Sequence, residues 1–268
     1  MHMPAVSGAE IIMSKAILYD ATQCIGCKQC EGACAEQNKL PYNDTVAAES
    51  IQSDHKYTVV LTKDDKFMRR LCQHCDHPAC ASVCPVGALH KTADGPVVYD
   101  VWKCIGCRYC MMACAFSVPK YEWGSLNPRV TKCIMCPDRV EKGLATACAT
   151  ACPTGATKFG DHDALIEEAK DRLKKNPDNY VNHIYGLQEV GGTSVLMLSA
   201  VPFEDFGLPK INRLGDVPLP EYTGRVMELM PDFIPLWGLV LGGVYWVTNR
   251  RKEVEEVEAE ERAMRGGK

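Results

Sequence analysis

Residues 104–114 read C-I-G-C-R-Y-C-M-M-A-C, and this stretch decides the fold of the chain. Its cysteines follow the spacing C-x2-C-x2-C-x3-C, which recurs without deviation at residues 24–34. Two further groups, at 72–84 and 133–152, keep the first and last steps of this run but lengthen the middle one. The sixteen cysteines therefore form four groups with none left over: Cys24, Cys27, Cys30 and Cys34; Cys72, Cys75, Cys80 and Cys84; Cys104, Cys107, Cys110 and Cys114; and Cys133, Cys136, Cys148 and Cys152.

This spacing favours iron over disulfides or zinc. The run is the one that ligates [4Fe–4S] clusters in bacterial ferredoxins. Disulfides suit short secreted chains, and cysteines two residues apart are poorly placed for a network of structural bridges. Zinc is the alternative, because C-x2-C pairs also build zinc ribbons, but those sites take two pairs set well apart. Here the first three groups each crowd four thiols into eleven to thirteen residues. We predict four [4Fe–4S] clusters with four thiolates each, and a protein that transfers single electrons.

Composition limits the possible partners. The 268 residues are 46% apolar and 24% charged, which is typical of globular proteins. The formal net charge is −4. Four clusters of about −2 each would bring the loaded chain to about −12, which argues against a nucleic-acid partner. Four cations lie beside cysteines and either offset part of this charge or are solvated surface residues: Lys28, Lys103, Arg108 and Lys132.

The cysteine groups belong to an internal repeat. Short strands are predicted at Lys15–Asp20 and at 97–100, each leading into a cysteine group. The sequence C-P-V-G-A-L at 84–89 returns as C-P-T-G-A-T at 152–157. There the proline is expected to end a short helix, and the glycine to allow a tight turn into the next strand. The fold class we predict is α+β, with two ferredoxin-like modules in a four-cluster domain over residues 14–160.

Two further segments surround this domain. The insertion at 35–71 contains a half-buried strand in which Tyr57, Val59 and Leu61 alternate, and we expect it to cover part of the cluster core. Residues 161–230 are predicted to form an extension that begins with an amphipathic helix over 161–175. Its cap is Asp161 or Asp163, its apolar face is Ala164, Leu165, Ala169 and Leu173, a strand follows at 193–201, and 202–220 is an extended strap.

Residues 233–249 contain no charge. As a helix they would be about 25 Å long, near the lower limit for a bilayer core. We predict a transmembrane anchor at 231–249 and a charged tail at 250–268; the alternative is a buried helix docked on a soluble partner. The cationic triplet at 250–252 places the C-terminus in the cytoplasm and the cluster domain on the outer, periplasmic face. Residues 1–13 show no export signal of their own.

No catalytic residue is predicted. The chain contains no G-x-S-x-G, H-E-x-x-H or G-x-x-x-x-G-K-[ST] motif, so nothing in it is typical of a site that binds and converts a substrate. We therefore predict an electron-transfer subunit whose catalytic partner is a different protein. His74 and His77 flank Cys75 and either donate hydrogen bonds to a cluster or serve in packing.

The ligands are expected to be shared crosswise, because the fourth cysteine of a ferredoxin run ligates the other cluster. Groups two and three are separated by nineteen residues and should form one module, which leaves groups one and four to form the other. The predicted sets are A, with Cys24, Cys27, Cys30 and Cys152; B, with Cys72, Cys75, Cys80 and Cys114; C, with Cys104, Cys107, Cys110 and Cys84; and D, with Cys133, Cys136, Cys148 and Cys34.

Between Leu18 and about Lys252, the sequence resembles the four-cluster iron–sulfur subunits of membrane-bound respiratory oxidoreductases. The motifs that carry the resemblance are the stretch at 104–114, S-V-P-K-Y at 117–121, K-C-I-M-C-P-D-R-V at 132–140, A-C-P-T-G-A at 151–156 and V-G-G-T-S-V-L-M-L at 190–198. The segment Val201–Lys210 followed by one apolar helix is most similar to the iron–sulfur subunit of quinone-linked uptake [NiFe] hydrogenases. The beta subunit of membrane-bound formate dehydrogenase is the alternative.

The resemblance implies two ferredoxin-like modules with cross-ligated clusters. It also implies two partners. One is a catalytic subunit with nickel–iron or a molybdenum or tungsten pterin, and the other is an integral membrane subunit that reacts with quinone. This protein would carry electrons between them. Export would then occur together with a partner that carries a signal.

Overall fold

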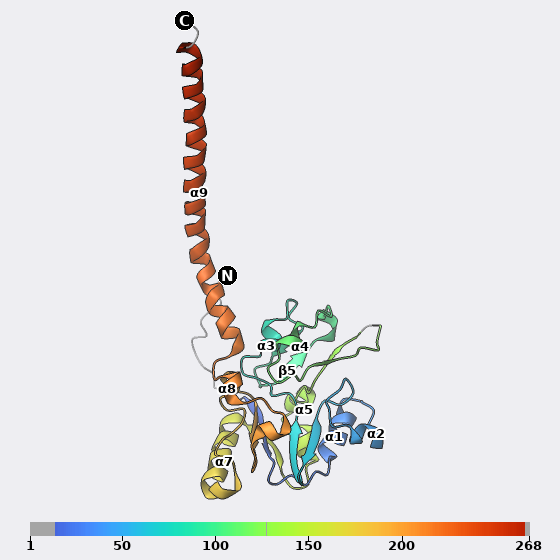
Figure 1. Ribbon diagram of the computed structural model, residues 1–268. Helices are drawn as coiled ribbons and strands as arrows, with labels where there is room; N and C mark the ends of the chain where they lie inside the picture. The colour runs from blue at the N-terminus through green and yellow to red at the C-terminus, as the bar shows by residue number, and fades with distance from the viewer. Residues whose placement is uncertain (1–13, 127, 266–268) are drawn as a thin grey trace. The chain divides into compact units, whose positions relative to one another are not determined.

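The computed structural model describes residues 14–126 and 128–265 and shows a mixed α+β chain (Figure 1). The chain divides into two units, one that ends at Pro220 and one that begins at Glu221. The first unit contains all sixteen cysteines and every strand found in the described residues. Residues 1–13, where we predicted no export signal, lie outside the described residues.

The largest sheet joins both ends of the first unit. Strand β1 (Lys15–Asp20) lies between β8 (Thr157–Asp161) and β9 (Val195–Leu198), antiparallel to β8 and parallel to β9. In the register, Tyr19 lies opposite Thr157. Because group one follows β1 and group four precedes β8, this register brings both groups to the same end of the sheet.

A smaller hairpin does the same for the other two groups. Strand β4 (Leu89–Lys91) follows Cys84, strand β5 (Val97–Tyr99) precedes Cys104, and the two strands pair antiparallel with Leu89 opposite Tyr99. Groups two and three therefore lie at one end of this hairpin. The pairing of group one with group four, and of group two with group three, is the nesting that the crosswise rule predicts.

Each cysteine group contains a short helix with the third cysteine as its second residue. These helices are α1 (Gln29–Gln37), α3 (Ala79–Ser82), α4 (Tyr109–Ala113) and α6 (Ala147–Thr150). Helices α3 and α6 end before Cys84 and Cys152, so the expectation that the following proline ends them was wrong. The glycines after these prolines, Gly87 and Gly155, do adopt the left-handed conformation of a tight turn, with φ values of 62° and 68°.

The three-stranded sheet is buried on both faces, because its side chains alternate between two apolar layers. One layer is formed with helix α7 (His162–Lys175) and includes Ala16, Leu18, Leu165, Ala169, Leu196 and Leu198. The other layer faces the cysteine groups and includes Ile17, Tyr19, Met68, Leu71, Cys72, Cys133, Cys148, Val195 and Met197. Cys72 of group two and Cys133 and Cys148 of group four are thus part of the core of the first unit.

The insertion forms a hairpin of β2 (Val59–Lys63) and β3 (Lys66–Arg70). Strand β2 begins at Val59 rather than at Tyr57, and Val59 and Val60 are both buried, so the simple alternation that we predicted is wrong. Val60 is buried, and its backbone N–H donates to the carboxylate of Glu31 on helix α1.

The segment after β8 contains the predicted helix, and its apolar face differs from the prediction at one residue. Leu165 and Ala169 are buried and Leu173 packs beside them, but Ala164 is exposed. The strand predicted at 193–201 is limited to β9, and the strap at 202–220 is not extended throughout. The strap contains η4 (Phe203–Phe206) and α8 (Ile211–Leu214). The remaining short elements of the first unit are α2 (Asp44–Ala48), η1 (Val101–Lys103), β6 (Lys120–Tyr121), β7 (Val130–Thr131), α5 (Pro137–Val140), η2 (Pro177–Asn179) and η3 (Glu189–Gly191).

Helix α9 (Leu219–Arg265) includes the uncharged run at 233–249. Among the residues that the structure describes, no helix combines the length and apolar character needed to cross a membrane. The transmembrane anchor predicted at 231–249 is therefore not supported. The uncharged run has only seventeen residues, or about 25 Å of helix against a bilayer core of about 30 Å, and it contains Pro235 and three glycines.

Candidate iron–sulfur centres

The loops of groups one and three need glycine at their third residue. Gly26 and Gly106 both have positive φ, at 68° and 70°. A Cβ atom on Gly26 would lie 2.3 Å from Cε1 of Phe67, and one on Gly106 would lie 2.9 Å from the hydroxyl of Tyr121. The loops therefore fit closely beneath aromatic side chains, and the glycines allow the tight loop that carries the first two cysteines of each group.

In the module formed by groups one and four, the fourth cysteine of group one, Cys34, is affected by the charges of group-four cysteines. Burial raises the pKa of the Cys34 thiol, and the negative charges of Cys133, Cys148 and Cys136 raise it further. Burial also raises the pKa of Cys30 to about 11, with contributions from Cys148 and Cys24. The thiol of Cys34 is thus subject to the charges of the other three members of the predicted set D.

In the module formed by groups two and three, the charge of the fourth cysteine of each group likewise affects the pKa of a thiol in the other group. Burial raises the pKa of Cys75, and so do the charges of Cys72, Cys114 and Cys80, which are the other members of set B. Burial raises the pKa of Cys110 to about 11, helped by Cys104, Cys107 and Cys84, the other members of set C.

The electrostatic influence of the thiols on one another links the sets in a row. The charge of Cys148 of set D acts on Cys30 of set A, and the charge of Cys72 of set B acts on Cys133 of set D. The charge of Cys110 of set C acts on Cys80 of set B. After burial, each of these charges helps to raise the pKa of a thiol. They indicate the order A, D, B, C along the molecule.

Several sulfur atoms already accept hydrogen bonds of the kind that tune iron–sulfur clusters. Backbone N–H groups of Ala88, Gly106 and Thr157 donate to the sulfurs of Cys84, Cys104 and Cys152, at 3.2, 3.4 and 3.4 Å. Burial acts to raise the pKa of Cys152, but the bonds from the Thr157 backbone and from Thr154 lower it on balance. The Asn38 amide lies 3.6 Å from the sulfur of Cys34, and the Thr146 hydroxyl 3.3 Å from that of Cys148.

The buried polar atoms test whether clusters fit these sites. In the described part of the chain, three buried side-chain atoms have no hydrogen-bond partner, and all lie one or two residues from a group cysteine: Gln73 Oε1, His74 Nε2 and Thr131 Oγ1. The Val97 N–H donates to Nδ1 of His74 at 2.8 Å, and burial lowers the pKa of this histidine, so the proton of the neutral ring is on Nε2. A buried donor without an acceptor costs about 1–3 kcal/mol. A cluster has sulfurs that could accept bonds from the His74 Nε2–H and the Thr131 hydroxyl, so these two residues fit one, whereas Gln73 Oε1 is itself an acceptor and gives no such support.

The thiols do not converge on single ions. All sixteen cysteines are free, and no group of three or more His, Cys, Asp or Glu side chains among the described residues could hold one metal ion. The ligand sets themselves therefore stay a prediction, supported by the sheet registers and by the neighbours of each thiol.

Two of the four predicted cations donate hydrogen bonds to backbone carbonyls, one of them to a group cysteine. Lys132 is buried, and its ammonium donates to the carbonyls of Val97 and Cys133. Lys28 donates to the carbonyl of Ala47 at 2.6 Å, which ties the loop of group one to the insertion. The other two are ordinary surface cations: Lys103 pairs with Asp100 at 3.1 Å, and Arg108 lies over the rings of Tyr121 and Trp123.

Two cations near the cysteines were missed. The ammonium of Lys91 donates to the carbonyls of His74 and Cys75, both at 3.0 Å. Arg69 on β3 is buried, and the charge of Cys148 acts on it. Neither residue adjoins a cysteine in sequence, so only the strand registers place them there.

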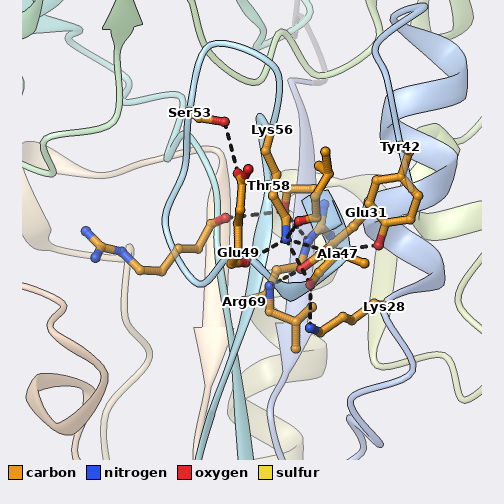
Figure 2. Close-up of polar contacts among 12 residues, drawn as sticks. Lys28, Glu31, Tyr42, Ala47, Glu49, Ser53, Lys56, Thr58 and Arg69 are labelled. Atoms are coloured by element: carbon orange, nitrogen blue, oxygen red, sulfur yellow. Dashed lines mark hydrogen bonds and ion pairs between the residues drawn. The ribbon is translucent and has the colours of Figure 1, made fainter. Parts of the chain in front are cut away.

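The insertion is held to helix α1 by a buried ion pair (Figure 2). Lys56 lies 2.9 Å from the carboxylate of Glu31, with exposed side-chain fractions of 3% and 0%. The same carboxylate accepts hydrogen bonds from the Val60 N–H at 2.6 Å and the Tyr42 hydroxyl at 3.1 Å. Because Glu31 follows Cys30 directly, this pair fixes the insertion against the helix that carries two group-one cysteines.

Sets A and C each present one cysteine at the surface, Cys27 and Cys107. Exposed apolar side chains lie near each of them in sequence. Ile25 is exposed close to Cys27, and Trp102, Ile105 and Met112 are exposed close to Cys107, with Trp102 at 94%. Sets A and C therefore each reach the solvent at one cysteine.

Comparisons with known proteins agree with this geometry. The family model of the 4Fe-4S dicluster domain matches residues 63–162. A protein of Nitratidesulfovibrio vulgaris is 39% identical over 264 residues, which cover 93% of this chain and 70% of that protein. Hydrogenase-2 operon protein HybA of Escherichia coli O157:H7 is 35% identical over 258 residues, 80% of this chain and 78% of HybA. The iron–sulfur subunit of the nitrate-inducible formate dehydrogenase of Escherichia coli K12 is 35% identical over 215 residues, 72% and 71% of the two chains.

Proposed function

Because this chain belongs to the family of iron–sulfur electron-transfer subunits that includes HybA and the formate dehydrogenase iron–sulfur subunit, we propose that it relays single electrons through four [4Fe–4S] clusters between a catalytic subunit and a quinone-reactive membrane subunit. That it carries several [4Fe–4S] clusters follows from the family and the sixteen cysteines. The number four, the ligand sets and the partners are the proposal. When bound, each cluster takes up and releases one electron.

The observation that carries the proposal is the row of cysteine sets in the order A, D, B, C. Charges of neighbouring sets act on one another at Cys30 and Cys148, at Cys133 and Cys72, and at Cys80 and Cys110. Tunnelling between redox centres falls steeply with distance, so a relay needs closely spaced sites along one path. The protein supplies such a path, buried in its middle and exposed at Cys27 and Cys107.

The chain's own residues prepare each site for an anionic cluster. The N–H groups of Ala88, Gly106 and Thr157 point at cysteine sulfurs, and His74 holds a buried N–H with no protein acceptor. Such donors stabilise added negative charge, and so they raise a cluster's reduction potential. The protein itself is proposed to be non-catalytic, with the chemistry of the substrate performed by its partner.

For the catalytic partner we propose a [NiFe] hydrogenase. The support is the extent of the similarity: the match to HybA covers 80% of this chain, against 72% for the formate dehydrogenase subunit. A molybdenum or tungsten oxidoreductase of the formate dehydrogenase type is the second candidate, because the percentage identity is the same, 35%. We propose a location on the outer, periplasmic face of the membrane, where the complex holds the cluster domain; protease digestion of intact spheroplasts tests it.

The deciding experiment is anaerobic purification of the complex from detergent-solubilised membranes. Four cubanes predict about sixteen irons and about sixteen acid-labile sulfides per chain, and four reducible EPR signals. Mass spectrometry of the co-purifying chains identifies the catalytic partner. About four zinc ions and no sulfide would refute the electron-transfer role, and a molybdenum or tungsten enzyme in place of a hydrogenase would refute the choice of partner.

A further inference from the structure

Arg69 is a charged residue in the interior of the first unit. It lies on β3 opposite Val60, and its exposed fraction is 1%. Its Nε donates to the hydroxyl of Thr58 at 2.9 Å, as Figure 2 shows, and a terminal nitrogen donates to the hydroxyl of Thr157 at 3.3 Å. Both acceptors are neutral, so neither of them balances the charge of the guanidinium.

The buried carboxylate of Glu31 on helix α1 already has its own partners. Glu31 pairs with Lys56 at 2.9 Å and accepts hydrogen bonds from Val60 and Tyr42 (Figure 2). Within residues 14–126 and 128–265, no carboxylate lies within ion-pair distance of Arg69. A buried charge without a counter-charge is costly, and one left unpaired in a protein typically destabilises it by several kcal/mol.

The anions that do surround Arg69 are cysteine sulfurs of two different sets. The charges of Cys148 and Cys133 of set D and of Cys30 of set A act on the guanidinium. Thr157, which accepts a hydrogen bond from Arg69, donates its own N–H to the sulfur of Cys152, also of set A, at 3.4 Å. The guanidinium therefore lies between the ligands of set A and those of set D.

We propose that Arg69 is the shared counter-ion of the clusters held by sets A and D, and that its charge raises the reduction potentials of both. The proposal rests on the proposed function, since it requires clusters at both sets. Reduction adds one negative charge to a cluster, and a fixed positive charge in a poorly screened interior favours the reduced form. Arg69 is thus a positioning residue for the relay: it sets the reduction potentials of the clusters at sets A and D without binding iron.

The effect is specific to these two sets. The cations that act on the thiols of set B are Lys91 and Lys132, not Arg69. The thiol of Cys110 in set C is affected by burial and by its own set. Loss of the charge at position 69 is therefore expected to change two of the four potentials and leave the other two.

The test is an EPR-monitored redox titration of the complex purified without oxygen, comparing wild type with Arg69→Gln and Arg69→Lys. Each EPR signal is first assigned with single cysteine-to-serine variants, one per set. The matched control is Lys66→Gln, which removes a positive charge from an exposed position on the same strand. We expect Arg69→Gln to lower the equilibrium constant for reduction of clusters A and D at least tenfold, about 59 mV for one electron, while Arg69→Lys and Lys66→Gln stay within about threefold of wild type.

Selective loss of iron from sets A and D in Arg69→Gln, with the signals of B and C retained, would equally support a counter-ion. Unchanged potentials, an equal change in all four, or the same change in Arg69→Lys as in Arg69→Gln would overturn the proposal. If Arg69→Gln gives no soluble chain, Arg69→Lys decides, since it must yield a loaded complex with clusters A and D near their wild-type potentials. The wild-type iron content and its four signals test the proposed function separately, so failure of one is distinguishable from failure of the other.

Discussion

Replacing Lys56 by methionine is expected to loosen the insertion from helix α1. In the folded chain Lys56 and Glu31 lie 2.9 Å apart and are 3% and 0% exposed. The ammonium also donates to the carbonyls of Val46 and Glu49, at 2.8 and 2.7 Å. Methionine fills a similar volume but leaves the carboxylate of Glu31 buried with no positive partner.

The magnitude follows from burial and from the bonds that remain. Removing one partner of a buried pair costs about 3–5 kcal/mol. Glu31 keeps its hydrogen bonds from Val60 and Tyr42, so we expect the lower end, about 3 kcal/mol. At about 1.4 kcal/mol per factor of ten, this is roughly a hundredfold increase in local opening. The surface pair of Lys63 and Asp205, 3.8 Å apart and half exposed, is a matched control worth about 0–1 kcal/mol.

The assay is amide hydrogen exchange of the loaded protein, read on helix α2 and strand β2. Lys56→Met should speed exchange there about a hundredfold, and Lys63→Met less than about fivefold. The double variant with Glu31→Gln should be less destabilised than Lys56→Met alone, because no buried charge is then left unpaired. Equal exchange in the two lysine variants, or additive effects in the double variant, would refute the reasoning.

Three further predictions concern a loop, a titration and a ligand. Gly26→Ala places a Cβ 2.3 Å from Phe67 at a φ of 68°, so iron should fall from about sixteen to about twelve per chain by elemental analysis. The hydrogen bond to Glu189 raises the pKa of His183, so the stability it contributes is full below about pH 6.5 and is lost as pH rises through the raised value. The melting temperature should fall over that range, and His183→Gln should flatten the slope. Cys104→Ala should remove one EPR signal under reducing conditions and leave three.

Each of these has a control or a contrary outcome. Gly124→Ala should retain all iron, because no atom lies within 4 Å of the added Cβ. The pKa of His55 is raised as well, so His55→Gln should remove a separate part of the same pH slope. A full iron content in Gly26→Ala, a melting temperature that rises with pH in this window, or four unchanged signals in Cys104→Ala would each contradict the corresponding argument.

Much of the cluster region was predictable because its information is local. The cysteine spacings, the strand at Lys15–Asp20 and the turns at Gly87 and Gly155 are set by neighbouring residues, and the structure contains each of them. The nesting of the modules was predictable from sequence distance together with the ferredoxin rule.

What could not be predicted depends on contacts between distant residues. Arg69 precedes Cys72 by three residues, yet the thiol whose charge acts on it most is Cys148, and no periodicity encodes that approach. The Glu31–Lys56 pair joins two segments that both read as surface, so its burial is visible only once the hairpin is in place. The uncharged run at 233–249 indicated a membrane-spanning helix near the lower length limit, but the structure has one helix over Leu219–Arg265, and no helix among the described residues is long and apolar enough to cross a membrane.

The central position of β1 has a consequence for how the protein is made. Its two neighbours come from residues 157–161 and 195–198, so the earliest strand to leave the ribosome waits for partners synthesised some 140 and 180 residues later. The thiols of sets B and C, by contrast, are all present once residue 114 has emerged. Iron insertion should therefore proceed from the inside outward, with the middle of the nascent chain loaded before its two ends meet.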